Sequence, residues 1–312
     1  MKFPFTAASD RTFDVLGFGT NAVDYLITVP EYPEFSSKIE LREYARAAGG
    51  EIASTMAGLQ RLGLKTAYAG SFGSDVEGEF GMRSLRDEHV DLSFSRQVPG
   101  AKTQIAFILI DLVSGERTVI WKRDPFLAWP PGTAPVEAVE AAAIVHMTPH
   151  DTGASIELAR AARSAGTIVS LDIDNVFDSI EELLPLVDVL ICSSEFPERF
   201  TGHRDHRVAL QEISSRFGNG LIGVTLGEDG SLLLCGENFV ETSGFAVPGG
   251  CKDTTGAGDA FRTGLLYGFL KGESVETAAV MANAVAALKC REIGARTALP
   301  NSNELRGFLI NS

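Results

Sequence analysis

Short apolar runs alternate with amphipathic segments along the second half of the chain. The apolar runs have the length of strands, and we expect strands at residues 143–147, 168–172, 187–192 and 221–226. The segments between them predict helices at residues 154–165, 179–184, 195–200 and 208–217. A chain that alternates in this way folds into right-handed βαβ units on a parallel sheet. The sequence therefore predicts an α/β fold with a mostly parallel central sheet.

The remaining segments carry more strand and turn signals. Strands are expected at residues 13–19, 25–29 and 66–72, an exposed strand pair at 37–47, and hairpins at 104–121 and 231–242. Helices are expected at residues 52–62, after Asp75 with Val76 and Phe80 facing inward, and at 257–270 and 275–288. No linker or repeat divides the chain, so we expect a single α/β domain over residues 1–312. A small discontinuous β lid would come from about residues 36–48 and 100–125.

Composition excludes some classes of partner. The formal net charge is −14, so no basic field is available to replace the counterions of a nucleic acid, and no nucleic-acid binding is expected. The longest apolar run is too short to span a bilayer, so no membrane segment is expected. The four cysteines form no C-x-x-C pair, which argues against a zinc site or a disulfide framework and favours a reducing cytoplasm.

Residues 253–261 carry the strongest chemical signal. Gly256 to Gly258 can turn successive N–H groups toward an anion, and the helix that begins there adds the positive end of its dipole. Asp259 then places a carboxylate beside an anion site. A carboxylate does not help to bind an anion, but it can remove a proton next to one. The segment therefore indicates phosphoryl transfer. The purely structural alternative is a helix start capped by Asp253 or Thr254.

The run Asp253-Thr254-Thr255-Gly256-Ala257-Gly258-Asp259-Ala260-Phe261 resembles the C-terminal signature of the ribokinase-like (PfkB) family of carbohydrate kinases. The resemblance implies a three-layer α/β/α domain and ATP as the phosphoryl donor. It assigns the role of catalytic base to Asp259. It assigns the anion hole to the backbone of Gly256, Ala257 and Gly258.

Other motifs extend the resemblance to the acceptor site. Asp24 is similar to the family's early aspartate, which holds sugar hydroxyls, and Gly49-Gly50 resembles the glycine pair that lies against the sugar. Asp253 is assigned to the substrate on the same ground. Ser54 stands where the family usually has an asparagine, so a longer, amide-bearing contact to the sugar is lost.

Two further segments imply the nucleotide site. Thr225, Gly227 and Gly230 lie in a turn that looks like the family's nucleotide-binding turn. Asn283 and Lys289 occupy the place of the final helix, which borders the adenine in the family. The resemblance therefore implies contacts between these residues and ATP.

Metal ions are implied by the resemblance alone. The family's Asn-x-x-Glu motif, which organises Mg²⁺ and phosphates, would fall near residues 192–196, where this chain has no asparagine. Glu195 is our candidate for the Mg²⁺-organising acid. Relatives are also activated by a monovalent cation such as K⁺, which here would depend on backbone carbonyls near residues 253 and 291–296.

The expected function is that of an ATP-dependent sugar kinase, and two alternatives stay open. A nucleoside kinase of the same fold would keep Asp259 and would clamp the base with Phe107 or Trp121. A non-catalytic sugar-sensing protein would be expected to lose Asp259. Lys122 and Arg123 would face a phosphate if the acceptor is a sugar phosphate. The expected assembly is a homodimer formed through the lid.

Two weaker motifs point elsewhere. Gly17 to Ala22 fits a G-x-G-x-x-A dinucleotide pattern, but the β-branched residues after it predict a strand where that site needs a helix. His146 and His150 have a spacing that binds metal on a helix, but they lie around a strand end. Neither motif therefore supports a cofactor or metal site.

Overall fold

The computed structural model describes residues 1–312 and is built around a sheet of eight strands. Their order is β14-β13-β12-β11-β10-β9-β1-β4. The strands from β4 to β12 pair in parallel, and β13 and β14 extend the sheet antiparallel, which confirms the expected mostly parallel sheet. Their bounds are β1 Phe13–Phe18, β4 Thr66–Ala69, β9 Ala142–Met147, β10 Ile168–Ile173, β11 Val189–Cys192, β12 Leu221–Thr225, β13 Ser231–Cys235 and β14 Asn238–Thr242.

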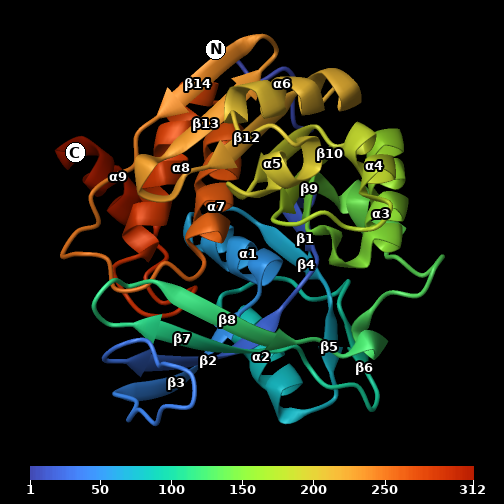
Figure 1. Cartoon of the computed structure of the whole chain (residues 1–312). Coiled ribbons are helices and arrows are strands. Elements are labelled where there is room, and N and C mark those ends of the chain that lie inside the picture. Colours follow the sequence, from blue (N-terminus) through green and yellow to red (C-terminus); the bar gives the residue numbers. More distant parts are fainter.

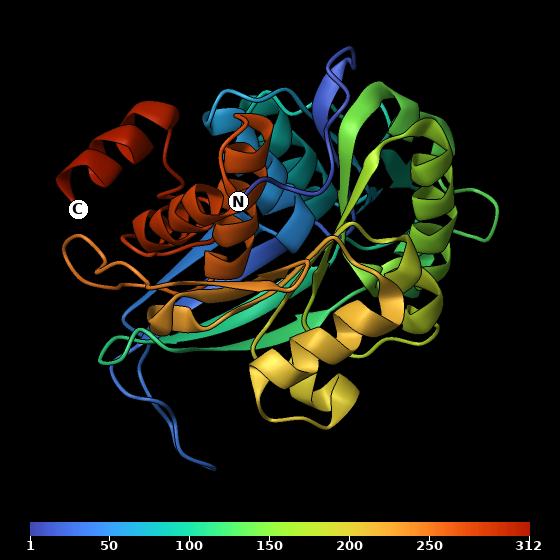
Figure 2. The same cartoon turned by 90° about the horizontal axis from the view of Figure 1, so that it is seen from above.

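Helices cover both faces of this sheet and make three layers (Figures 1 and 2). One face carries α3 (Thr152–Ala165), α4 (Ile180–Leu183), α5 (Phe196–Thr201) and α6 (His206–Phe217). The other face carries α1 (Glu51–Arg61), α7 (Ala257–Leu270) and α8 (Val275–Lys289). Each face has its own apolar core, because the parallel strands between them are buried on both sides. None of the helices has the length and apolar character that crossing a membrane requires.

A second, four-stranded sheet lies against one side of the molecule, at the lower left of Figure 1. Its order is β3 (Glu43–Gly49), β2 (Ala22–Val29), β7 (Ile105–Asp111) and β8 (Arg117–Lys122). The segments expected to form the lid supply β3, β7 and β8, but the sheet also includes β2, which the prediction left out. The expected strand pair at 37–47 is wrong: residues 37–42 form no strand, and a single strand, β3, begins at Glu43 and pairs with β2. Gly17 to Ala22 leads from β1 directly into β2, so no dinucleotide-binding helix follows it.

Three other expectations differ from the structure. The strand expected at 66–72 breaks at Gly70, where the Tyr68 ring leaves no room for a side chain, and continues as β5 (Ser71–Gly73) paired with β6 (Arg96–Val98). Helix α2 (Val76–Asp87) begins at Asp75 as expected, since the Asp75 carboxylate accepts a bond from Gly78, but Val76 is 65% exposed rather than buried. Helix α9 (Ser302–Asn311), which packs on α8, was not predicted. Short 3₁₀ turns occupy Pro125–Leu127, Val136–Ala141, Pro149–Asp151, Leu184–Leu186 and Gly227–Asp229.

Candidate active site

The start of α7 forms a tight glycine turn at the carboxyl end of the central strands. Gly256, the residue before the helix, has φ +77°, a left-handed conformation that favours glycine, and a side chain there would also meet Ala295 at 2.9 Å. Asp259 lies in the first turn of the helix. Its carbonyl accepts hydrogen bonds from the hydroxyls of Thr55 (3.4 Å) and Thr263 (2.9 Å). The backbone of this turn is therefore fixed by the helix α1 on one side and by α7 itself on the other.

The Asp259 carboxylate is set apart electrostatically. It accepts no hydrogen bond from the protein and is partly exposed to solvent. Burial, together with repulsion from Asp172, raises its pKa to about 7, while Arg262 opposes the rise. A carboxylate with that pKa can hold or release a proton near neutral pH, as a general base must.

Asp172 and Arg262 form a buried ion pair beside Asp259 that the sequence reasoning missed. Their closest atoms, Nη2 and Oδ1, are 2.6 Å apart, and Nη2 also donates to the carbonyl of Ile191 at 3.2 Å. A Cβ added to Gly258 would lie 2.5 Å from Nη1 of Arg262, so this nitrogen borders the glycine turn. Nη1 makes no hydrogen bond, and it retains some solvent access. The usable signal was a charged residue within an apolar element, Asp172 near the carboxyl end of its strand and Arg262 inside α7.

Acidic and aromatic side chains lie near Asp172 and Asp259. Glu51, the first residue of α1, accepts a hydrogen bond from the Thr20 hydroxyl at 3.1 Å and lies 3.6 Å from Nδ1 of His150. Burial and the neighbouring Asp172 raise the pKa of Glu51 well above its usual value. The His150 ring packs against Trp121 of the second sheet, with ring centres 6.4 Å apart. Trp121 therefore connects the second sheet to His150 and Glu51.

Asp24 lies on the same face of the second sheet as Trp121. Strand register puts Asp24, Ala106 and Trp121 in one row, and side chains in one row share a face. Asp24 is 4% exposed, yet its carboxylate accepts no hydrogen bond from the protein. Burial raises its pKa to about 6, although Arg296 lowers it. A buried carboxylate without a partner is suited to accept hydrogen bonds from a ligand.

The glycine pair keeps the backbone close to Asp24. A side chain at Gly49 would overlap the Asp24 carboxylate, and Gly50 has φ +88° and packs against the backbone of Asn21. Ser54 is the place where the expected asparagine is missing. Its hydroxyl accepts a bond from Nε of Arg296 at 3.2 Å, and Arg296 also donates to the carbonyl of Gly49. Arg296, which was not predicted from the sequence, therefore holds Ser54 and the backbone of Gly49 in place.

Asp253 and Lys289 are both fully buried and bind each other. The Lys289 ammonium donates to the Asp253 carbonyl at 2.7 Å. The Asp253 carboxylate accepts bonds from the backbone of Thr255 (2.8 Å) and of Gly294 (2.8 Å), and from the Thr255 hydroxyl (2.6 Å). The sequence assigned Asp253 to the substrate and Lys289 to the nucleotide, and in the structure both side chains are buried and make contacts within the protein.

The residues expected at the nucleotide lie mostly together. Thr225 ends β12. Gly227 begins the following 3₁₀ turn and Gly230 comes directly after it, with φ +61° and +99°. Asn283 of α8 donates to the Thr242 hydroxyl at 2.8 Å, which brings α8 against the adjoining hairpin. Glu195 is exposed just before α5, after the carboxyl end of β11, and has no protein partner.

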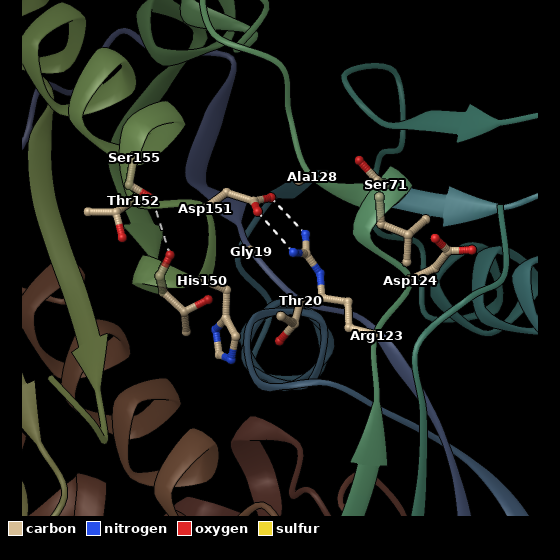
Figure 3. A network of polar contacts seen from close by, with 12 residues as sticks. Gly19, Thr20, Ser71, Arg123, Asp124, Ala128, His150, Asp151, Thr152 and Ser155 are labelled. Carbon is tan, nitrogen blue, oxygen red and sulfur yellow. Dashed lines mark hydrogen bonds and ion pairs between the residues drawn. The ribbon is translucent and has the colours of Figure 1, made fainter. Parts of the chain in front are cut away.

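Arg123 binds within the protein rather than facing a ligand. Figure 3 shows its guanidinium paired with the Asp151 carboxylate through two bonds of 2.9 and 2.7 Å. The Ser155 hydroxyl, in the same network, donates to the Thr148 carbonyl at 3.2 Å. The pair links the chain after β8 to the start of α3. On the same strand, Arg117 donates to the Thr254 hydroxyl at 2.7 Å, so the second sheet also touches the glycine segment.

Known proteins resemble this chain over nearly all of its length. The family model described as pfkB family carbohydrate kinase matches residues 15–302. A protein named ATP-dependent ribose-1-phosphate kinase from Halopiger xanaduensis is 29% identical over 304 residues, which are 95% of this chain and 97% of that one. A protein named nucleoside kinase from Methanothermobacter thermautotrophicus is 26% identical over 298 residues, which are 93% of this chain and 94% of that one.

Solved structures have the same fold. A ribokinase from Arabidopsis thaliana complexed with ribose and ATP matches with a TM-score of 0.83 and 25% identity, over 96% of this chain and 99% of that one. An adenosine kinase from Sinorhizobium meliloti matches with a TM-score of 0.81 and 22% identity, over 95% of this chain and 99% of that one. The expected ribokinase-like three-layer fold is confirmed.

Proposed function

We infer the activity of this chain from the fact that it belongs to the pfkB family of carbohydrate kinases. It is an ATP-dependent kinase of the sugar and nucleoside class. We propose that its acceptor is a sugar or a sugar derivative, and that Asp259 is the base that deprotonates the acceptor hydroxyl. The observation that carries this proposal is a carboxylate with a pKa of about 7 and no protein partner, at the start of α7.

In the proposed reaction, Asp259 accepts the proton of the acceptor hydroxyl. The acceptor oxygen forms a bond to the γ-phosphorus of ATP, the bond from that phosphorus to the bridging oxygen breaks, and ADP leaves. The N–H groups of Gly256 and Gly258 and the helix dipole stabilise the charge on the moving phosphoryl group. The N–H of Ala257, which was also assigned to the anion hole, donates to the carbonyl of Thr254 at 3.1 Å. Nη1 of Arg262 borders the same turn and adds a fixed positive charge.

The acceptor lies, in this proposal, between the second sheet and the central strands. Asp24 accepts hydrogen bonds from its hydroxyls, and Gly49 and Gly50 let it approach the backbone. The second sheet acts as a lid that excludes water, which would otherwise compete with the acceptor. ATP lies over Thr225 to Gly230 and beside Asn283.

Mg²⁺ fits these residues as an ion that arrives with the nucleotide. No three His, Cys, Asp or Glu side chains converge into a cage for a metal. Mg²⁺ commonly takes one or two carboxylates and completes its shell with phosphate oxygens and water. Glu195, exposed and without a partner, would supply the carboxylate, and the ion would neutralise phosphate charge. A free monovalent cation does not fit, because the Lys289 ammonium already binds the Asp253 carbonyl.

A nucleoside acceptor is the second candidate, and Trp121 favours it. Trp121 is 56% exposed on the same face of the second sheet as Asp24, next to His150, where a base could stack. Phe107, the other residue suggested as a base clamp, lies on the opposite face and stacks on Tyr25 with ring centres 5.2 Å apart. Phe107 is therefore unavailable for that role.

The opposite face of the second sheet is the proposed dimer surface. Tyr44, Phe107 and Ile120 lie on that face and are 74%, 42% and 57% exposed. An exposed apolar surface of this kind commonly marks a protein interface. We propose that a second copy of the chain covers it.

The test is a coupled assay of ADP formation with ATP and Mg²⁺ over a panel of sugars, sugar phosphates and nucleosides. We expect one chemical class to stimulate ADP formation well above the rate without acceptor. Asp259→Asn is the control, since it should remove this stimulation with the best acceptor. If no acceptor stimulates the wild-type protein, the proposed acceptor class is wrong.

A further inference from the structure

Lys289 is a lysine with no access to solvent at the end of α8. Its side chain and that of Asp253 are both 0% exposed. Removing an ammonium group from water is unfavourable unless oxygen atoms of the protein replace its hydration. The surroundings of Lys289 must therefore be built to hold a positive charge.

The oxygen atoms around the ammonium come from a single residue of the glycine segment. Nζ lies 2.7 Å from the carbonyl oxygen of Asp253 and 3.9 Å from Oδ2 of its carboxylate. The same Oδ2 accepts the N–H of Gly294, and Oδ1 accepts the N–H of Thr255. One positive charge thus joins the end of α8, the segment before the glycine turn and the loop at Gly294.

A second contact shows how close these segments lie. The N–H of Lys252 donates to the carbonyl of Cys290 at 2.9 Å, so the chain on either side of Lys289 runs beside the chain that leads to Gly256. This is the place where carbonyls near residues 253 and 291–296 were expected to bind a free monovalent cation. An ammonium and K⁺ carry the same charge and are both bound by carbonyl and carboxylate oxygens.

We infer that the Lys289 ammonium is a built-in monovalent cation that fixes the backbone of Asp253 to Thr255, from which the glycine turn follows. The protein consequently needs no free K⁺ at this place. Burial lowers the pKa of Lys289, and the Asp253 carboxylate opposes that change. The effect on catalysis rests on the proposed function, whereas the effect on folding does not.

The experiment compares thermal unfolding in KCl, NH₄Cl and tetramethylammonium chloride at equal ionic strength. The wild-type protein should unfold at the same temperature in all three salts. Lys289→Ala leaves space for an ion, so its unfolding temperature should fall by about 5–10 °C in tetramethylammonium chloride and recover in KCl or NH₄Cl. Lys289→Met removes the charge but fills the space, so no salt should restore it.

Several results would overturn the inference. One is a wild-type unfolding temperature that rises in KCl. Another is a Lys289→Ala variant that is as stable as wild type, and a third is a Lys289→Ala variant that remains unfolded in every salt. Rates of ADP formation with the best acceptor should follow the same salt pattern. If no acceptor supports turnover while the unfolding pattern holds, the proposed function fails and the built-in cation stands.

Discussion

Asp259 is the residue on which the chemistry depends, because it combines a raised pKa with a carboxylate that no protein group occupies. Replacing it with asparagine keeps the shape and removes the proton acceptor. We expect Asp259→Asn to lower kcat by about 10²- to 10⁴-fold. Calorimetric titration with AMP-PNP should still show nucleotide binding within a few-fold of wild type. Turnover close to the wild-type rate would mean that another group takes the proton.

The pH dependence of kcat/KM provides a second test at this scale. Since the base must be deprotonated, kcat/KM should fall about tenfold per pH unit below the pKa of Asp259, which is about 7. Asp172 repels the charged form of Asp259, so Asp172→Asn should move this midpoint to lower pH. The charge of Arg262 would then no longer be neutralised by Asp172, so its effect on Asp259 would shift the midpoint in the same direction. An unchanged midpoint would contradict the coupling between Asp172 and Asp259.

At the scale of the element, the glycine turn at the start of α7 can be tested by a substitution at Gly258. Gly258 has ordinary helical geometry, but a methyl group there would lie 2.5 Å from Nη1 of Arg262. Gly258→Ala should therefore displace the guanidinium and lower kcat by about tenfold or more, with an unchanged circular dichroism spectrum. The matched control is Gly153→Ala, in the first turn of α3, where an added methyl group meets nothing within 4 Å. The control should keep wild-type kcat. Equal kcat in both variants would mean that Arg262 has no role in the proposed anion site.

The second sheet makes a prediction about assembly. If a second copy covers its outer face, the double change Phe107→Asp and Ile120→Asp should convert a dimer into a monomer. Light scattering coupled to size-exclusion chromatography measures this directly. Val208→Asp is the control, because Val208 is 42% exposed on α6, far from that face in the fold. A wild-type monomer at micromolar concentration would rule out the proposed interface.

Folding stability is a property of the whole molecule, and the buried acids around Asp259 reduce it near neutral pH. Asp259 has a folded pKa of about 7 and an unfolded pKa near 4, so between these values the folded state binds more protons. Its contribution to the free energy of unfolding therefore falls as pH rises through this window. Asp259→Asn should be more stable than wild type by about 1–2 kcal/mol at pH 8, and about equal near pH 4, in urea unfolding. A difference that does not depend on pH would contradict the raised pKa.

The sequence alone predicts most of the central sheet and the glycine segment, because both depend on local signals. The apolar run before Asp172 forms the expected strand, and Gly256 adopts the left-handed conformation that its lack of a side chain allows. Partners distant in sequence could not be predicted in this way. The contact of Asp172 with Arg262 exists only because β10 and α7 meet in the folded chain. Lys289 shows the same limit, since only the fold brings its ammonium to Asp253.

The alternation of side chains along β7 and β8 has a consequence for how such a protein can diverge. Neighbouring positions such as Ile120 and Trp121 serve different tasks. Ile120 lies on the face proposed to meet a second copy, and Trp121 lies on the face that carries Asp24. Selection for a new acceptor and selection for a new assembly therefore act on interleaved positions of the same two strands. A single inserted residue would exchange the two sets at once, so this hairpin should tolerate substitutions far better than changes in length.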